Sequence, residues 1–237
     1  MSSKTAMDEI LLPVSLGEAI DKLTILDIKL SSIQDHRRVD VQREYDILCI
    51  KLKPFVDTYG TLYHFMKKIN LAIWDQMNAL RNKELRDDKR YEICLECLES
   101  NDVRFRIKRK INLACKSALQ EQKSYNMSRL VIELQCEDVA SFEHAIRYLS
   151  FIYDEVVIQS PHNVDRLKAA FEYDKTVMYN VDVTDLAVSR RVHARDARQL
   201  EDAMSITGEH LDFARLDADT RSTKRPRWRP SLLSAPK

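Results

Sequence analysis

The sequence predicts an α+β chain in which a bundle or coiled coil of long antiparallel helices precedes a small α/β domain with a parallel sheet. Apolar residues recur every three or four positions in the first half, which is typical of amphipathic helices. After Tyr125, short apolar runs alternate with helical patterns, which indicates βαβ units. The C-terminal end is basic and free of acids, which predicts an extended tail. We therefore expect a helical domain over residues 1–127, an α/β domain over 128–204 and a tail over 205–237.

The composition is that of a chain that folds around a core. Hydrophobic residues make up 44% of the 237 residues and charged residues 32%, which is ordinary for a globular protein. Three glycines are too few for a glycine-rich phosphate loop, and a net charge of +1 argues against a general nucleic-acid binder. No apolar run approaches the roughly 20 residues of a membrane span. The N-terminal stretch MSSKTAMDEI lacks the apolar core of a signal peptide. The five cysteines are an odd number, which indicates reduced thiols rather than a set of disulfides. We expect no membrane span and an intracellular, reducing compartment, the cytoplasm or an organelle.

The first helix is expected between Pro13 and Ile33. Ser15 and Glu18 form a capping box that marks its start. Its apolar residues lie in alternating steps of three and four, on one face that other helices must cover. They are Leu16, Ala19, Leu23, Leu26, Leu30 and Ile33. We therefore predict that Leu23 and Leu26 are buried.

Three more long helical segments follow, over about Asp40–Tyr59, from Thr61 onward and over about Asp87–Gln122. Pro54 is expected to kink or end the second helix, because proline lacks an amide donor. Gly60 is expected to stop that helix at its C-terminal end. Four long segments with short connections predict antiparallel neighbours.

The fourth segment contains two further features. Its apolar register slips between Leu98 and Val103, so we expect a break or bend at residues 99–102. Cys94 and Cys97 have the spacing of a zinc or redox pair. A closed zinc site needs about four ligands, and no second C-x-x-C or pair of histidines at ligand spacing accompanies them. We interpret them as thiols on a helix face and expect no metal site.

The helical part resembles an uncharacterised, mostly bacterial family of helical domains. Its opening signature matches Leu12–Lys29, which reads LPVSLGEAIDKLTILDIK. Two later blocks match as well, namely Ile69–Asp75 and Arg109–Asn112 continuing to Glu121–Tyr125. The resemblance covers roughly residues 12–125 and brings no established activity. It implies a setting, because such domains are often found beside proteins that build surface polysaccharides.

The elements of the α/β part alternate along the chain. Strands are expected at Arg129–Gln135, Asp154–Gln159 and Thr176–Val181, and helices at Val139–Phe151, Asn163–Tyr173 and Asp185–Met204. The last of these helices is densely charged with sparse apolar positions, which indicates an exposed or partner-facing helix.

This part resembles the first half of a GT-B glycosyltransferase of the heptosyltransferase-like type. Arg147–Ile158, which reads RYLSFIYDEVVI, and Pro161–Asn163 carry the resemblance, which spans roughly residues 129–183. It implies a truncated half of a Rossmann-type domain.

The loop after the first strand departs from that family. The family loop reads Gly-Leu-Gly-Asp-His, and its aspartate can serve as catalytic base. Here the sequence is Gln135-Cys-Glu-Asp-Val139, in which Asp138 matches the aspartate while the glycines and the histidine are missing. Fewer than sixty residues follow Val181, too few for a second domain that would bind a nucleotide sugar. We therefore interpret this half as degenerate and non-catalytic, with Asp138 as a vestigial residue.

Four other residues are candidates for a function. His162 and Asn163 follow the second strand, and strand ends are where open parallel sheets bind ligands. The alternative for His162 is a role in a turn. Asp21 and Lys22 belong to the signature of the helical family, and the alternative for them is a surface ion pair or a helix-end contact.

The tail is expected to dock. Residues 220–237 contain six basic residues, three prolines and no acid. Such a segment cannot bury enough apolar surface to fold alone, and its prolines favour extended backbone. We expect it to lie in an acidic groove of a partner, with a solvated tail as the alternative. The predicted docking residues are Arg221, Arg225, Arg227, Trp228 and Arg229.

Together these features predict a non-catalytic interaction or scaffold subunit, without a cofactor, that docks in a larger protein assembly through helix faces and its tail. The alternative is an accessory protein of surface-glycan synthesis that retains some sugar-nucleotide binding. A third reading, nucleic-acid contact through the arginine-rich region 190–229, is disfavoured by the near-neutral charge. We expect protein subunits as partners rather than nucleic acid or a small molecule.

Overall fold

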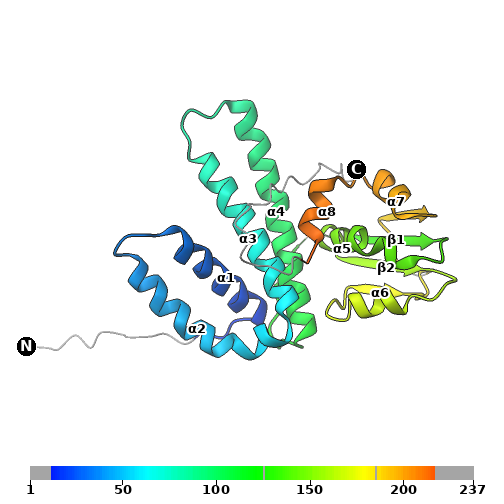
Figure 1. The fold of residues 1–237 in the computed structure, drawn as a ribbon, viewed down its shortest axis with the longest axis horizontal. Coiled ribbons are helices and arrows are strands. Elements are labelled where there is room, and N and C mark those ends of the chain that lie inside the picture. Colours follow the sequence, from blue (N-terminus) through cyan, green and yellow to red (C-terminus); the bar gives the residue numbers. More distant parts are fainter. Residues whose placement is uncertain (1–11, 125, 185, 217–237) are drawn as a thin grey trace, which may run out of the picture.

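The computed structural model describes residues 12–124, 126–184 and 186–216. This part of the chain contains eight α-helices, one short 3-10 helix and a four-stranded parallel sheet, so the chain is α+β as predicted. Helices α1 to α4 form one region, and the sheet with the later helices forms the other (Figure 1). None of the helices in these ranges has the length and the apolar character needed to cross a membrane.

The first hairpin consists of α1 (Leu16–Ser32) and α2 (Arg38–Thr58). The hydroxyl of Ser15 accepts a hydrogen bond from the Glu18 amide at 3.2 Å, so the predicted start of α1 is confirmed. The predicted burial is confirmed too, because Leu23 is 1% exposed and Leu26 is 2% exposed.

The second hairpin consists of α3 (Gly60–Leu80) and α4 (Asp87–Ala114). Helix α2 ends at Thr58, two residues before the glycine that was predicted to stop it, but Gly60 does not have the positive φ of a C-terminal glycine cap. Gly60 is the first residue of α3, and Tyr59 alone separates the two helices, with φ of −120° and ψ of 40°. Pro54 lies inside α2, four residues before its last residue, Thr58.

Two expectations about α4 are wrong. The helix continues through residues 99–102 without a break. In this stretch the buried Ser100 accepts a hydrogen bond from the side chain of Gln76 at 3.0 Å, so α4 packs against α3 here. It ends at Ala114 rather than near Gln122. Lys116 has a positive φ of 51°, which reverses the chain as a helix C-terminus requires.

The sheet has the strand order β3-β2-β1-β4, and all its strands are parallel. The strands are β1 (Arg129–Leu134), β2 (Glu155–Gln159), β3 (Val177–Tyr179) and β4 (Arg190–Ala194). The expected helix over Asp185–Met204 is wrong. Its middle is β4, which pairs with β1, and only α7 (Ala197–Ala203) is helical. Val192 and Ala194 face the core from this strand, so tertiary pairing prevails over the helical pattern.

The remaining helices are η1 (Val139–Phe142), α5 (Glu143–Ile152), α6 (Asp165–Ala170) and α8 (Gly208–Ala214). Helix α8 lies within the segment expected to be an extended tail, and it buries His210, Phe213 and Ala214. The predicted docking residues of the tail lie outside the described residues.

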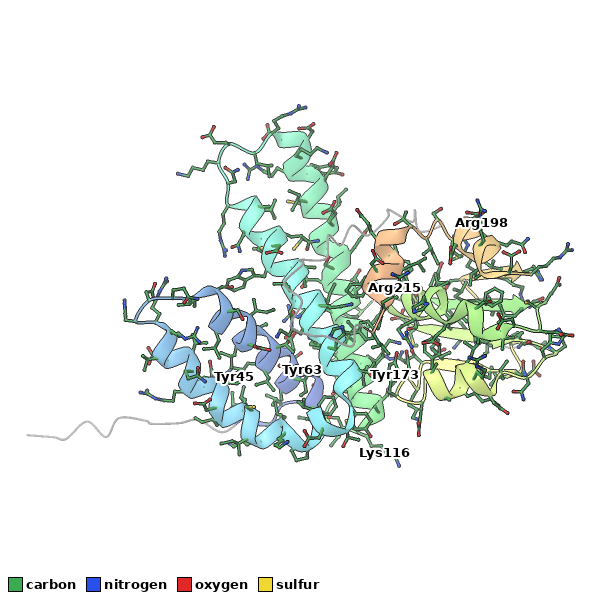
Figure 2. All side chains as sticks on the ribbon, in the orientation of Figure 1. Tyr45, Tyr63, Lys116, Tyr173, Arg198 and Arg215 are labelled. Atoms are coloured by element: carbon green, nitrogen blue, oxygen red, sulfur yellow. The ribbon has the colours of Figure 1, made fainter. Side chains whose placement is uncertain are left out.

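The two regions share one hydrophobic core. Phe65 of α3, Phe151 of α5 and Phe213 of α8 form an aromatic cluster, with ring centroids 4.7 to 6.0 Å apart. Lys68 of α3 donates hydrogen bonds to the carbonyls of Phe213, at 3.2 Å, and Arg215, at 2.9 Å. A cation at these carbonyls is favourable, because the C-terminal end of a helix carries partial negative charge. Figure 2 shows Arg215 where α8 approaches the helical region.

Candidate functional site

The opening signature, Leu12–Lys29, and the second block of the family resemblance, Ile69–Asp75, meet in the interior of the helical region. Asp21 of α1 accepts hydrogen bonds from Asn70 of α3 at 2.9 Å and from the Arg104 guanidinium of α4 at 2.8 and 2.5 Å. Thr24 accepts a further hydrogen bond from Asn70 at 2.8 Å. Asp21 is only 3% exposed, so the signature places a buried, paired carboxylate between three helices.

The third block meets the same helix one turn earlier. Gly17 donates its amide proton to the side-chain oxygen of Asn112 at 2.8 Å. A Cβ atom at Gly17 would lie 2.8 Å from the backbone oxygen of Lys108, so glycine permits α1 and α4 to approach closely. The position therefore requires the absence of a side chain.

Lys108 joins this polar cluster to the segment after α4. Its ammonium donates to Glu18 at 2.6 Å and forms an ion pair with Glu121 of the third block. Burial disfavours the charged form of Lys108, but hydrogen bonds to Glu121 and Glu18 raise its pKa overall. The three signature blocks are thus one spatial cluster.

The carboxylate of Asp21 is fully engaged in contacts between helices. Each carboxylate oxygen of Asp21 is occupied by a donor from another helix. Buried polar pairs of this kind fix the register between helices. Lys22, the other signature candidate, pairs with Glu44 of α2 at 2.5 Å, with both side chains about half exposed. Lys22 therefore forms a surface ion pair, which is the alternative considered for it.

A second buried pair joins the helical region to the sheet. Lys110 of α4 is 1% exposed, and its ammonium lies 2.7 Å from Asp174, which precedes β3. Thr176 donates its hydroxyl proton to Asp174 at 2.7 Å. Burial lowers the pKa of Lys110, while Asp174 acts in the opposite direction. Sequence reasoning missed both residues, and the position of Lys110 inside the third signature block was the available signal.

Other polar residues of α4 contact the amino ends of the strands. Arg106 donates to the carboxylate of Asp154 at 3.2 Å, and Arg109 donates to its backbone oxygen at 2.8 Å. Asp154 also accepts from the amide of Ser128, at 2.8 Å, just before β1. Helix α4 is therefore held at the amino edge of the sheet, opposite to the edge where open parallel sheets bind ligands.

The candidates of the α/β part lie at that opposite, carboxyl edge. Asp138 follows β1 and is exposed, while His162 and Asn163 follow β2. The His162 amide donates to the Ser160 hydroxyl at 3.1 Å, and Asn163 accepts from the Asp165 amide at 2.7 Å. These two residues therefore form a turn, which is the alternative considered for His162.

The order of the strands reverses between β1 and β4, which is where doubly wound sheets bind nucleotides. Asp138 follows β1 there, and Asp196 follows β4 and caps α7 by accepting from the Gln199 amide at 2.8 Å. Sequence reasoning missed Asp196 because it missed β4. Across the described ranges, no three His, Cys, Asp or Glu residues gather as metal ligands.

The distal halves of α3 and α4, residues 71–103 with the connecting loop, form an arm that extends beyond the other elements (Figure 1). On its outer surface Met77 is 41% exposed, and Tyr91 and Leu98 are each 66% exposed. Cys94 lies between the latter two and is also exposed. Spacings of three and four place Tyr91, Cys94 and Leu98 on one side of α4. We call these four residues the apolar face of the arm.

The cysteine pair belongs to this surface. Both thiols are free, and the Cys97 sulfur lies 3.9 Å from the sulfur of Met77 across the hairpin. Burial, and then the neighbouring Cys94, raise the pKa of the Cys97 thiol. The pair thus contributes soft, weakly polar atoms to the contact between α3 and α4.

A protein-family model described as "Family of unknown function (DUF6165)" matches residues 10–144. The match spans α1 to α4, β1 and η1, and it confirms the resemblance of the helical part to a family without known activity. No curated protein and no solved structure matches the chain. The comparisons provide no support for the expected fusion to a glycosyltransferase-like half.

Proposed function

The chain belongs to the family of unknown function DUF6165, and we propose that it is a non-catalytic interaction subunit that docks in a larger protein assembly. The observation that carries this proposal is the apolar face of the arm. Tyr91 and Leu98 are each two-thirds exposed on a hairpin that extends beyond the other elements. An exposed aromatic residue with aliphatic neighbours is the usual anchor of a protein–protein interface.

The interior of the arm supports the same reading. The buried contact between its two helices includes a polar pair, Gln76 and Ser100, at a position where a self-sufficient hairpin would place apolar residues. Tyr91 and Leu98, by contrast, are exposed. With this distribution of side chains, the arm is less stable alone than in contact with a partner.

The base of the arm is suited to hold it in a fixed direction. Asn70 and Arg104 lie where the arm begins, and both bind the buried carboxylate of Asp21. A rigid base lowers the entropy lost on docking, because the arm is already oriented.

The test is co-purification of the tagged full chain at native abundance, with mass spectrometry of the recovered partners. The variant Tyr91→Ser/Leu98→Ser should lose those partners while its melting temperature stays close to that of the unaltered chain. The matched control is Val39→Ser/Ile50→Ser on α2, where the side chains are 63% and 77% exposed. Full recovery with the arm variant, or equal loss with the control, would contradict docking through the arm.

The alternative is an accessory protein of surface-glycan synthesis, a degenerate glycosyltransferase-like half with residual sugar-nucleotide binding. The strand order is the observation in its favour, because it has the reversal at which nucleotides bind. Against it, Glu137, Asp138 and Asp196 follow the two strands there, and carboxylates repel phosphates. We expect no low-micromolar Kd in calorimetry with a panel of nucleotide sugars. Such a Kd, abolished by Asp138→Asn, would favour the alternative.

A further inference from the structure

We propose that the apolar face of the arm is covered, in the free protein, by the C-terminal segment of the same chain, residues 220–237. This inference does not depend on the proposed assembly, because it concerns the isolated chain. It assigns one occupant to the exposed hairpin and gives the tail a docking site within its own molecule.

The arm exposes apolar side chains to which an extended segment could bind. Met77, Tyr91 and Leu98 are 41%, 66% and 66% exposed, and they come from both helices of the hairpin. Isolated exposed apolar residues are ordinary, but here they gather with Cys94 on one side of α4 and beside Met77 of α3. A segment with an aromatic anchor and no need for regular structure fits such a surface.

The charge on the arm selects a cationic occupant. Residues 71–103 contain eight acids and five basic residues, and all five basic residues lie at positions 81–90, around the connecting loop. Away from that loop the arm carries Asp75, Glu92, Glu96, Glu99 and Asp102, of which Glu92 pairs with Lys89 at 2.6 Å. Burial, and then the charges of Glu96 and Asp102, raise the pKa of Glu99. A positive partner would relieve this repulsion between carboxylates.

The C-terminal segment has the complementary chemistry. It carries Arg221, Lys224, Arg225, Arg227 and Arg229 within nine residues, it has no acid, and its only aromatic residue is Trp228. Arginine and tryptophan are the residues that most often anchor interfaces. The expected contact pairs Trp228 with the apolar face and the arginines with the acids beside it.

The chain leaves the described part close to this surface. Lys68 of α3 holds the carbonyls of Phe213 and Arg215 at 3.2 and 2.9 Å, so residue 216 follows directly beside α3. Met77 lies nine residues farther along the same helix, which is about 14 Å at 1.5 Å per residue. The twelve residues from 216 to 228 span up to about 40 Å when extended. The connection is therefore long enough for docking within one molecule.

Docking within the molecule is favoured over docking on another copy by the tether. A short tether holds the segment at an effective concentration in the millimolar range. A second copy reaches that concentration only in concentrated solution. A protein partner would have to displace the segment, and covering the arm would keep its apolar face from unspecific contacts until then.

The test uses the full chain labelled with 5-fluorotryptophan. The chain has two tryptophans, Trp74 and Trp228, and the variant Trp228→Phe assigns the two fluorine resonances, because only that of Trp74 remains in it. A synthetic, equally labelled peptide of residues 220–237 supplies the resonance of the undocked segment. In the chain at low salt, the Trp228 resonance should be shifted from that of the peptide, and added salt should move it to the peptide position, because screening weakens charge contacts.

Two sets of variants test whether the contact between the segment and the arm is specific. The changes Arg225→Glu, Arg227→Glu and Arg229→Glu reverse the charge of the segment and should release Trp228. On the arm, Glu96→Gln, Glu99→Gln and Asp102→Asn should release it equally. The matched control neutralises three exposed acids of α2 with Asp40→Asn, Asp46→Asn and Asp57→Asn, and it should leave Trp228 shifted.

Three results would overturn the inference. The first is a Trp228 resonance of the unaltered chain that coincides with that of the peptide at low salt. The second is an equal release of Trp228 by the arm variant and the α2 variant, which would indicate an unspecific charge effect. The third is a shift that depends on protein concentration, together with a dimer mass in sedimentation, which would place the segment on another copy. None of these results affects the co-purification test of the arm, so the two proposals fail separately.

Discussion

The base of the helical region, where α1 packs against α3 and α4, and the arm, which consists of the distal halves of α3 and α4, follow opposite patterns. In the base, Leu23 and Ile107 are buried and the buried charges of Asp21 and Lys110 have partners on other elements. In the arm, the polar pair Gln76 and Ser100 is buried, while Tyr91 and Leu98 are exposed. The chain closes its own base, whereas the arm presents to the outside what a closed bundle would bury.

The contrast teaches where the signature has its role. Asp21, Asn70 and Asn112 all belong to the base or to its border with the arm, and each hydrogen-bonds to another element. Such residues stabilise an arrangement of helices and leave the arm free for contact. The comparison can be tested by making the same chemical change in both places.

The largest effect is expected from breaking the buried ion pair. Lys110→Met leaves the Asp174 carboxylate buried without its cation, which should lower the free energy of unfolding by about 3–5 kcal/mol. The arm offers the control, because Lys89 and Glu92 form an exposed pair, and Lys89→Met should cost less than about 1 kcal/mol. Urea denaturation measures both.

The double variant Lys110→Met/Asp174→Leu checks the cause. Replacing both partners by apolar residues removes the uncompensated charge, so much of the lost stability should return. If the double variant unfolds as easily as Lys110→Met, the loss reflects packing and not the charge of Asp174.

The next effect is expected from shortening a leucine in each place. Leu23→Ala removes a side chain that is 1% exposed and should cost about 2–5 kcal/mol, because a cavity remains. Leu98→Ala removes one that is 66% exposed and should change stability by at most about 0.5 kcal/mol. Thermal melts decide this, and equal shifts would contradict the distinction between base and arm.

A smaller effect is expected from adding a methyl group to glycine. At Gly17 the new Cβ would lie 2.8 Å from the Lys108 backbone oxygen, so Gly17→Ala should destabilise by about 1–3 kcal/mol. At Gly60 nothing lies within 4 Å, so Gly60→Ala should not destabilise. Alanine ordinarily favours a helix over glycine, hence a stabilised Gly17→Ala variant would show that α1 and α4 can separate without loss.

The smallest effect concerns the acids of the arm and depends on pH. The pKa of Glu99 is raised in the folded chain, so the folded state loses stability as pH rises through that value. Glu99→Gln removes this loss and should raise the melting temperature at pH 7. Below the ordinary pKa of glutamate, about 4.3, both forms are neutral and the gain should vanish. Glu84→Gln in the exposed loop is the control, and an equal gain there would indicate a general charge effect.

Much of the fold was predictable from local pattern. The start of α1 at Ser15 follows from the capping box with Glu18, and the burial of Leu23 and Leu26 follows from the helical period. The first three strands were expected near their observed positions because short apolar runs alternate with helical patterns. The misses have physical causes that lie elsewhere in the chain. Helix α4 stays continuous where its apolar register slips, with Ser100 buried against Gln76 of α3, and β4 is a strand because β1 lies beside it.

The sequence by itself therefore determined the first four helices, the first three strands, the apolar face of α1 and the resemblance of three motifs to one family. Only the tertiary structure decided what the motifs are for. Asp21 and Arg104 lie 83 positions apart, and Lys110 and Asp174 lie 64 apart. Local pattern records which residues share a face, since helical and strand periods act between near neighbours. A buried charge finds its partner only when the chain has folded, because the partner is selected by the cost of burying either group alone.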